Sequence, residues 1–145
     1  MTDAAIRGSA PIDIDAHRPP CVAADAPLDI DALNRLRVSV GAQAFDEVFE
    51  DAVFEVTERL ARLEALAARS DIDGVGRLSH DLIAVAAQIG LRGVSEVAAR
   101  LRDCCATENV IAMHAVAARL LRVGEDSLVR AAEMSVDIND LVEGA

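Results

Sequence analysis

The segment spanning residues 42–68 contains neither Gly nor Pro, and its apolar side chains follow a helical period. They recur in steps of three or four residues, at positions 45, 49, 52, 56, 60, 63 and 67. This spacing puts them on one face of an α-helix and does not fit a strand. A long helix with one apolar face needs other elements to cover that face, so the sequence predicts helix-on-helix packing.

Three further segments show the same period. We expect a helix that carries His80 and ends at Gly90, a helix over residues 94–105 that begins after a break at Gly93, and a last helix from about residue 110. The inner row of the second of these is predicted to include Cys104. In the last helix, Gly124 falls on the inner face, which indicates either close packing or a weak point.

A shorter helix is expected before the long one. Asp29 or Asp31 can cap its start, and Gly41 stops it. We expect it to act as a lid, and no alternating strand pattern competes with the helices. The predicted fold is all-α: an antiparallel four-helix bundle with a short N-terminal lid helix.

The predicted organisation has three parts. Residues 1–26 hold three of the four Pro residues without a sustained period, and we expect a disordered leader there. Residues 27–134 form the bundle. Residues 135–145 are acidic and poorly patterned, so a flexible tail is expected.

Charge and composition argue against several classes of partner. The formal net charge is −11, and all 14 basic residues are Arg. Such a field repels nucleic acid and anionic membranes, and the apolar runs are shorter than the ~20 residues that span a bilayer. The three Cys residues lack metal-ligand spacing, so neither a metal site nor a cofactor is expected. We therefore expect a cytoplasmic protein that binds neither nucleic acid nor membrane.

His80 is the candidate reactive residue. Burying Leu78, Leu82 and Ile89 turns its imidazole outward, because these residues lie on the opposite side of the helix. A neutral imidazole can attack a phosphoryl group at physiological pH without a metal or a strong base. His114 is predicted to be a packed or rim residue. The outward face that carries His80 is shared by side chains that are mostly small or apolar: Arg77, Ile83, Ala84, Ala87 and Leu91.

The region after His80 resembles the histidine-containing phosphotransfer (Hpt) domain family. The family has an aliphatic–Gly pair nine and ten residues after its His, where this chain has Ile89 and Gly90, and small residues lie between. Residues 28–33 are similar to the start of the family's lid helix, so the likeness covers about residues 27–134.

The resemblance implies a phosphoryl carrier rather than an enzyme. His80 would be the phosphoacceptor, and the partner would be a receiver domain of a response regulator or hybrid histidine kinase in a two-component phosphorelay. That partner would supply the aspartate and the bound Mg²⁺. The implied docking residues are Gly76, Ile83, Ala84, Ala87 and Leu91.

Two positions depart from the family pattern. Ile83 stands where the family usually has a Lys that holds the phosphoryl oxygens, and Ala84 stands where Gly is usual. Arg77, one turn before His80, could bind phosphate in place of that Lys, or it could be a solvated surface charge. Ile83 could extend the docking surface or pack at the rim against the neighbouring helix.

Three functions fit these features. The favoured one is a phosphorelay intermediate that carries a phosphoryl group on His80 between receiver aspartates. A degenerate Hpt-like module that docks without accepting phosphate is the alternative, and Ile83 is its best support. A structural bundle that associates with copies of itself through Ile83 and Leu91 is the third.

Overall fold

The computed structural model describes the backbone of residues 28–144 and the side chains of residues 28–134. The predicted leader, residues 1–26, lies outside this range. The helices of the described part are α3 (Ile30–Val40), α4 (Ala42–Ala68), α5 (Ile72–Gln88), α6 (Arg92–Ala106) and α7 (Val110–Gly144). In this part of the chain, the β-type pairing is one isolated bridge between Leu28 and Leu91. The all-α prediction is confirmed.

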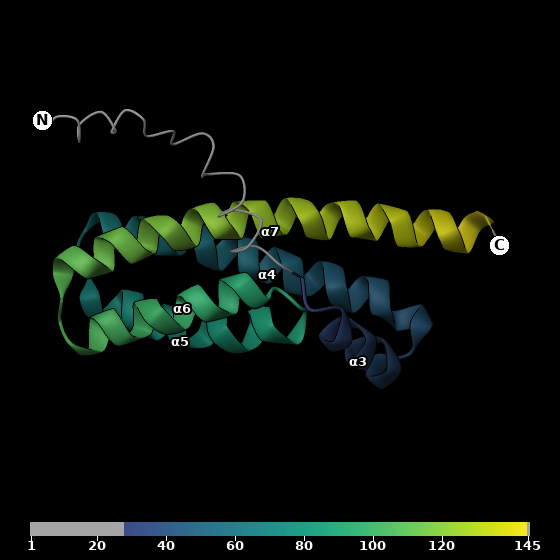
Figure 1. The fold of residues 1–145 in the computed structure, drawn as a ribbon, viewed down its shortest axis with the longest axis horizontal. Coiled ribbons are helices and arrows are strands. Elements are labelled where there is room, and N and C mark those ends of the chain that lie inside the picture. Colours follow the sequence, from purple (N-terminus) through teal and green to yellow (C-terminus); the bar gives the residue numbers. More distant parts are fainter. Residues whose placement is uncertain (1–27, 145) are drawn as a thin grey trace, which may run out of the picture.

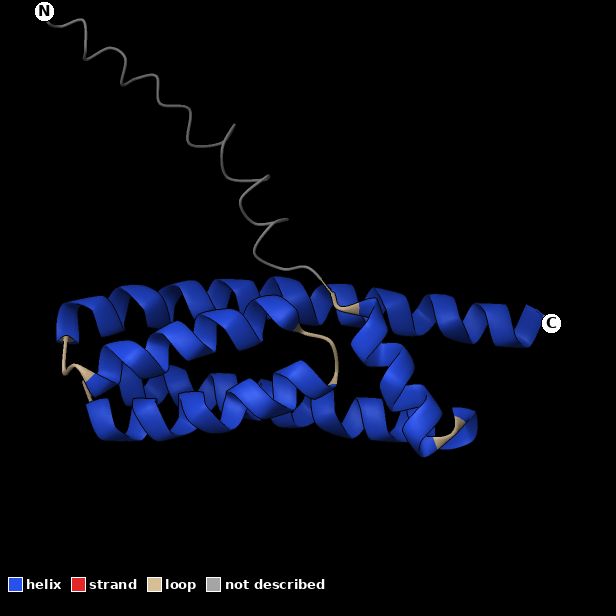
Figure 2. Cartoon of the chain, turned by 60° about the horizontal axis from the view of Figure 1, so that its bottom comes forward, coloured by secondary structure: helices blue, strands red, loops and turns tan. Residues whose placement is uncertain are grey.

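The four long helices pack as a closed ring (Figures 1 and 2). α4 contacts α5, α5 contacts α6, α6 contacts α7, and α7 contacts α4. The α5–α6 pair is shorter than α4 and α7, so one end of α4 and α7 extends beyond it (Figure 1). α3 packs on α4 and on α5 at this extended end.

The core of the described residues is almost entirely aliphatic. The largest completely buried side chains come from all four long helices, and they include Leu63, Leu82, Leu101 and Leu120. The aromatic contribution is a stack of Phe45 on Phe49 with ring centroids 5.6 Å apart. Both rings are buried, as the sequence predicts, and they lie in the half of α4 near α3.

Side-chain caps explain where three of the helices begin. The Asp29 carboxylate accepts a hydrogen bond from the Ala32 N–H at 3.1 Å, and Asp71 caps α5 in the same way. Asn109 accepts from the Ala112 N–H at 3.0 Å at the start of α7. These bonds satisfy N–H groups that have no partner within the helix. Of the two candidates that the sequence left open for the first of these helices, Asp29 is thus the cap and Asp31 is not.

The boundaries and faces of α6 and α7 differ from the prediction. α6 begins at Arg92, so the predicted break at Gly93 is wrong, and Gly93 is buried within the helix. The predicted inward position of Cys104 is also wrong in detail, because the inner row of α6 passes through Cys105 and leaves Cys104 half-buried. α7 is helical to Gly144, which is well beyond the predicted end of the bundle at residue 134.

Gly124 marks a close approach between α7 and α4. A Cβ placed on it would lie 2.5 Å from Cδ1 of Leu60, closer than two carbon atoms can approach. Of the two interpretations of this residue, close packing is therefore confirmed. No helix in the described part of the chain is long and apolar enough to cross a membrane.

Candidate functional site

His80 lies in the middle of α5 with its side chain exposed. Two buried residues close to it in the sequence, Ser79 and Leu82, hold the opposite face of the helix in the core. Ser79 is completely buried, and its hydroxyl donates to the Val75 carbonyl oxygen at 2.7 Å. Leu82 is also completely buried. The backbone below His80 is therefore held firmly, while the imidazole faces outward as the sequence predicts.

Three of the predicted docking residues around His80 have small side chains. Ala84 and Ala87 are exposed, and Gly76 is half-buried one turn before His80. A Cβ placed on Gly76 would lie 3.2 Å from the Cβ of Cys105. The missing side chain at Gly76 therefore lets α6 approach α5 closely, and Gly76, Ala84 and Ala87 raise no bulky side chain beside the imidazole.

Leu91 does not belong to this surface. Its predicted place on the exposed face with His80 is wrong, because its side chain is completely buried. Gly90 ends α5 with φ +79, which turns the chain away from the helical direction on which the prediction relied. Leu91 then forms the isolated bridge with Leu28 and packs into the core.

Ile83 is half-buried and packs against the core. Its carbonyl oxygen accepts a hydrogen bond from the Ser95 hydroxyl of α6 at 3.2 Å. The interpretation that Ile83 packs at the rim against the neighbouring helix is confirmed. Its remaining exposed surface lies one turn from His80.

Arg77 is exposed on the turn before His80. The two residues are three apart and therefore neighbours on the helix surface. Phosphate binding by Arg77 stays a prediction.

His114 lies elsewhere, near the start of α7, where its Nε2 is 3.0 Å from the Ser70 hydroxyl. His114 is exposed, so of its two predicted positions the rim position is confirmed and the packed position is wrong.

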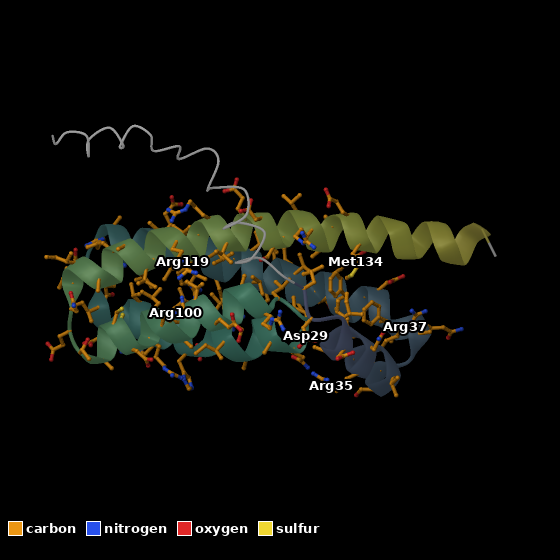
Figure 3. The ribbon with its side chains drawn as sticks, in the orientation of Figure 1. Asp29, Arg35, Arg37, Arg100, Arg119 and Met134 are labelled. Carbon is orange, nitrogen blue, oxygen red and sulfur yellow. The ribbon has the colours of Figure 1, made fainter. Side chains whose placement is uncertain are left out.

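Two neighbouring features are absent from the predicted site because they come from other helices. α6 brings Ser95 next to α5, and only the packing of the two helices reveals this. α3 adds Arg35, which lines a pocket of about 240 Å³ between α3 and the end of α5. Figure 3 shows Arg35 on α3, below the body of the bundle in that view. The predicted docking residue Ala87 lines the same pocket, so the surface around His80 continues onto α3.

The comparisons with known proteins agree with this geometry. A model of the Hpt domain family matches residues 47–132, which is more than half of the chain. The chain belongs to the Hpt domain family. The matched segment starts within α4 and ends within α7, so it contains His80 and leaves α3 outside.

A solved Hpt structure has the same fold. It is the crystal structure of histidine-containing phosphotransfer protein B from Pseudomonas aeruginosa PAO1, which superimposes with a TM-score of 0.70 at 15% sequence identity. The match covers 76% of this chain and 95% of that chain. No curated protein matches the sequence. At this identity, the Hpt fold is preserved although most side chains differ.

Proposed function

We propose that this Hpt protein is a phosphorelay intermediate that carries a phosphoryl group on His80 between aspartates of receiver domains. The observation that supports it best is the exposed imidazole at the centre of α5, above a firmly packed helix and beside Gly76, Ala84 and Ala87. In this proposal α4 to α7 form the antiparallel bundle that presents His80, and α3 is the lid helix.

The transfer needs little from this chain. A lone pair on one ring nitrogen of neutral His80 attacks the phosphorus of a receiver's aspartyl phosphate. The P–O bond to the aspartate breaks, its electron pair stays on the carboxylate, and the imidazole proton passes to solvent. The onward step runs this reaction in reverse on a second receiver.

The remaining catalytic groups would come from the partner. A receiver-bound Mg²⁺ would stabilise the charge on the phosphoryl oxygens during transfer. The docking surface on this chain would comprise Gly76, Ile83, Ala84 and Ala87, and Arg77 would face the phosphoryl group. A docking residue beside His80 must leave the ring nitrogen accessible to the receiver. The small side chains at Gly76, Ala84 and Ala87 fit this requirement.

Phosphoryl transfer from a labelled receiver tests the proposal. Incubation with a phosphorylated receiver domain and Mg²⁺ is expected to give acid-labile, base-stable label on the wild type. His80→Gln should abolish it, and His114→Gln serves as the matched control that keeps it. Label that survives in His80→Gln would sink the proposal.

A degenerate docking module is the second candidate. Ile83 favours it, because the side chain that replaces the family's Lys is half-buried against the core and offers no charge. It predicts that His80→Gln binds a receiver as tightly as wild type in titration calorimetry and that the wild type accepts no label. Ala87→Glu, on the exposed surface, should abolish binding under either function.

A further inference from the structure

Two contacts fix the register of α6 along α5. Gly76 lies against Cys105, where a Cβ on the glycine would be 3.2 Å from the cysteine Cβ. Further along, the Ser95 hydroxyl donates to the Ile83 carbonyl oxygen at 3.2 Å. The residue numbers rise on α5 and fall on α6 between these contacts, so the helices are antiparallel. Any residue between the two contacts can therefore be placed along the pair.

Arg102 lies at the level of His80. His80 follows Gly76 by four residues, about 6 Å of helix, and Arg102 precedes Cys105 by three residues, about 4.5 Å. Both displacements run in the same direction from the Gly76–Cys105 contact because the helices are antiparallel. Counted from this contact the two residues are about 2 Å apart along the bundle, and counted from the Ser95–Ile83 contact they are about 6 Å apart. Both contacts thus place Arg102 within about one helical turn of His80 along the bundle.

Arg102 also lies on the side of α6 that faces α5. It follows Ser95 by seven residues, two helical turns, so both project from the same face, and Ser95 reaches the α5 backbone. Helical side chains lean toward the N-terminus of their own helix. For Arg102 this direction leads away from Cys105 and past His80 toward Ile83.

The guanidinium of Arg102 has only a weak partner. Its Nη2 is 3.3 Å from an Asp103 carboxylate oxygen, and the two side chains are 44% and 72% exposed. An exposed pair between adjacent residues adds little stability, because solvent screens the charges. A dianionic phosphoryl group nearby can therefore displace Asp103 from the guanidinium, which can then bind two phosphoryl oxygens at once.

We propose that Arg102 binds the phosphoryl group on His80 and supplies, from α6, the cation that Ile83 does not supply on α5. This inference rests on the proposed function. Charge-assisted hydrogen bonds from Arg102 would stabilise both the phosphohistidine and the charge that moves during transfer. Arg102 projects from the side of α6 that is nearer to α5, whereas Arg77 projects from α5 farther from the flank between the two helices.

A small phosphoryl donor tests Arg102 without a receiver. With potassium phosphoramidate, the donor's P–N bond breaks, a P–N bond to His80 forms, and the imidazole proton leaves with the nitrogen as ammonia. Intact mass and ³¹P NMR would follow phosphohistidine in wild type, Arg102→Gln and Arg77→Gln. Arg100→Gln is the matched control, since Arg100 is an exposed arginine of the same helix on a different face.

We expect Arg102→Gln to accumulate phosphohistidine about tenfold more slowly than wild type, as the loss of one charge-assisted bond implies. Arg100→Gln should stay within about twofold, and Arg77→Gln should slow the reaction less than Arg102→Gln does. Arg102→Lys should recover part of the rate, because it keeps the charge but loses the bidentate geometry. Asp103→Asn should not slow the reaction. Unchanged thermal unfolding would exclude a folding defect in each variant.

The outcomes separate this inference from the function on which it rests. If His80 is labelled and Arg102→Gln reacts like wild type, Arg102 is not the phosphate-binding residue although the carrier function stands. A rate that falls in Arg77→Gln alone assigns the role to Arg77. A wild type that takes no label, or label that persists in His80→Gln, overturns the carrier function and the role of Arg102 together.

Discussion

The backbone N–H of Asp29 donates to the carbonyl oxygen of Gly90 at 2.7 Å, so the start of α3 is bonded to the end of the helix that carries His80. Gly90 adopts φ +79, and a Cβ there would lie 2.8 Å from the Asp29 carbonyl oxygen. Ile89, just before it, is 1% exposed. The aliphatic–Gly pair after His80 thus has a structural role: Ile89 anchors α5 in the core and Gly90 lets the α3 segment approach.

Gly90→Ala is expected to destabilise the protein more than Gly41→Ala. Both glycines have positive φ, so each alanine meets about 1–2 kcal/mol of backbone strain. The new Cβ at Gly90 also collides with Asp29 and Leu33, whereas the space around Gly41 is open. Urea unfolding of the two variants measures the difference. Equal losses in the free energy of unfolding would show that the contact between Gly90 and the α3 segment adds nothing to stability.

Gly124→Ala is expected to lower the free energy of unfolding by about 1–3 kcal/mol, because the methyl group overpacks the contact with Leu60. Alanine otherwise favours a helix over glycine by about 1 kcal/mol. In a Leu60→Ala background the clash disappears, so the same substitution should become neutral or stabilising. A double-mutant cycle by thermal unfolding checks this, and additive effects would contradict the close packing.

Glu108→Gly is expected to stabilise the chain by up to about 1 kcal/mol, since a non-glycine residue in the left-handed region carries a steric cost. Glu108 has φ +55 at the end of α6. Ser70 has the same φ at the end of α4, but its hydroxyl contacts His114. Ser70→Gly should therefore gain less, and chemical denaturation of both variants compares them. A loss of stability in Glu108→Gly would contradict this account.

The Cys105 thiol is expected to react slowly at neutral pH. Burial raises its pKa, and Cys104 and Asp73 raise it further. A raised pKa leaves less thiolate at a given pH, so alkylation of Cys105 should lag behind that of the more exposed Cys104 and accelerate as the pH rises. Iodoacetamide labelling of Cys21→Ser, followed by peptide mass analysis, gives both rates. Faster labelling of Cys105 at neutral pH would be the contrary result.

Ile83→Lys restores the family's usual cation one turn after His80. Its aliphatic stem can follow the path of Ile83 while the ammonium reaches solvent, at a cost of about 1 kcal/mol from lost burial. If the Arg102 guanidinium already serves the phosphoryl group, the new Lys should raise the rate of His80 phosphorylation only slightly in wild type and more strongly in Arg102→Gln. Equal gains in the two backgrounds would show that the two cations act independently.

Local pattern was sufficient to predict the helices and the exposure of His80. The helical period of residues 42–68 and the aliphatic residues opposite His80 depend only on the geometry of one helix. Predictions failed where the chain changes direction. Extending the helix of His80 past Gly90 puts Leu91 on the exposed face, whereas the turn at Gly90 buries it. Gly93 looked like a break, yet it packs inside α6.

The sequence by itself determined that the chain is all-α, that His80 faces outward, and that glycines at positions 41 and 90 stop helices, because these properties follow from the pattern along single helices. The tertiary structure decided which residues from different helices meet. Gly76 packs against Cys105, Asp29 bonds to Gly90, and the register of α6 on α5 brings Arg102 within about one helical turn of the level of His80. No period within one helix encodes such a register, because it is set by how two surfaces fit together.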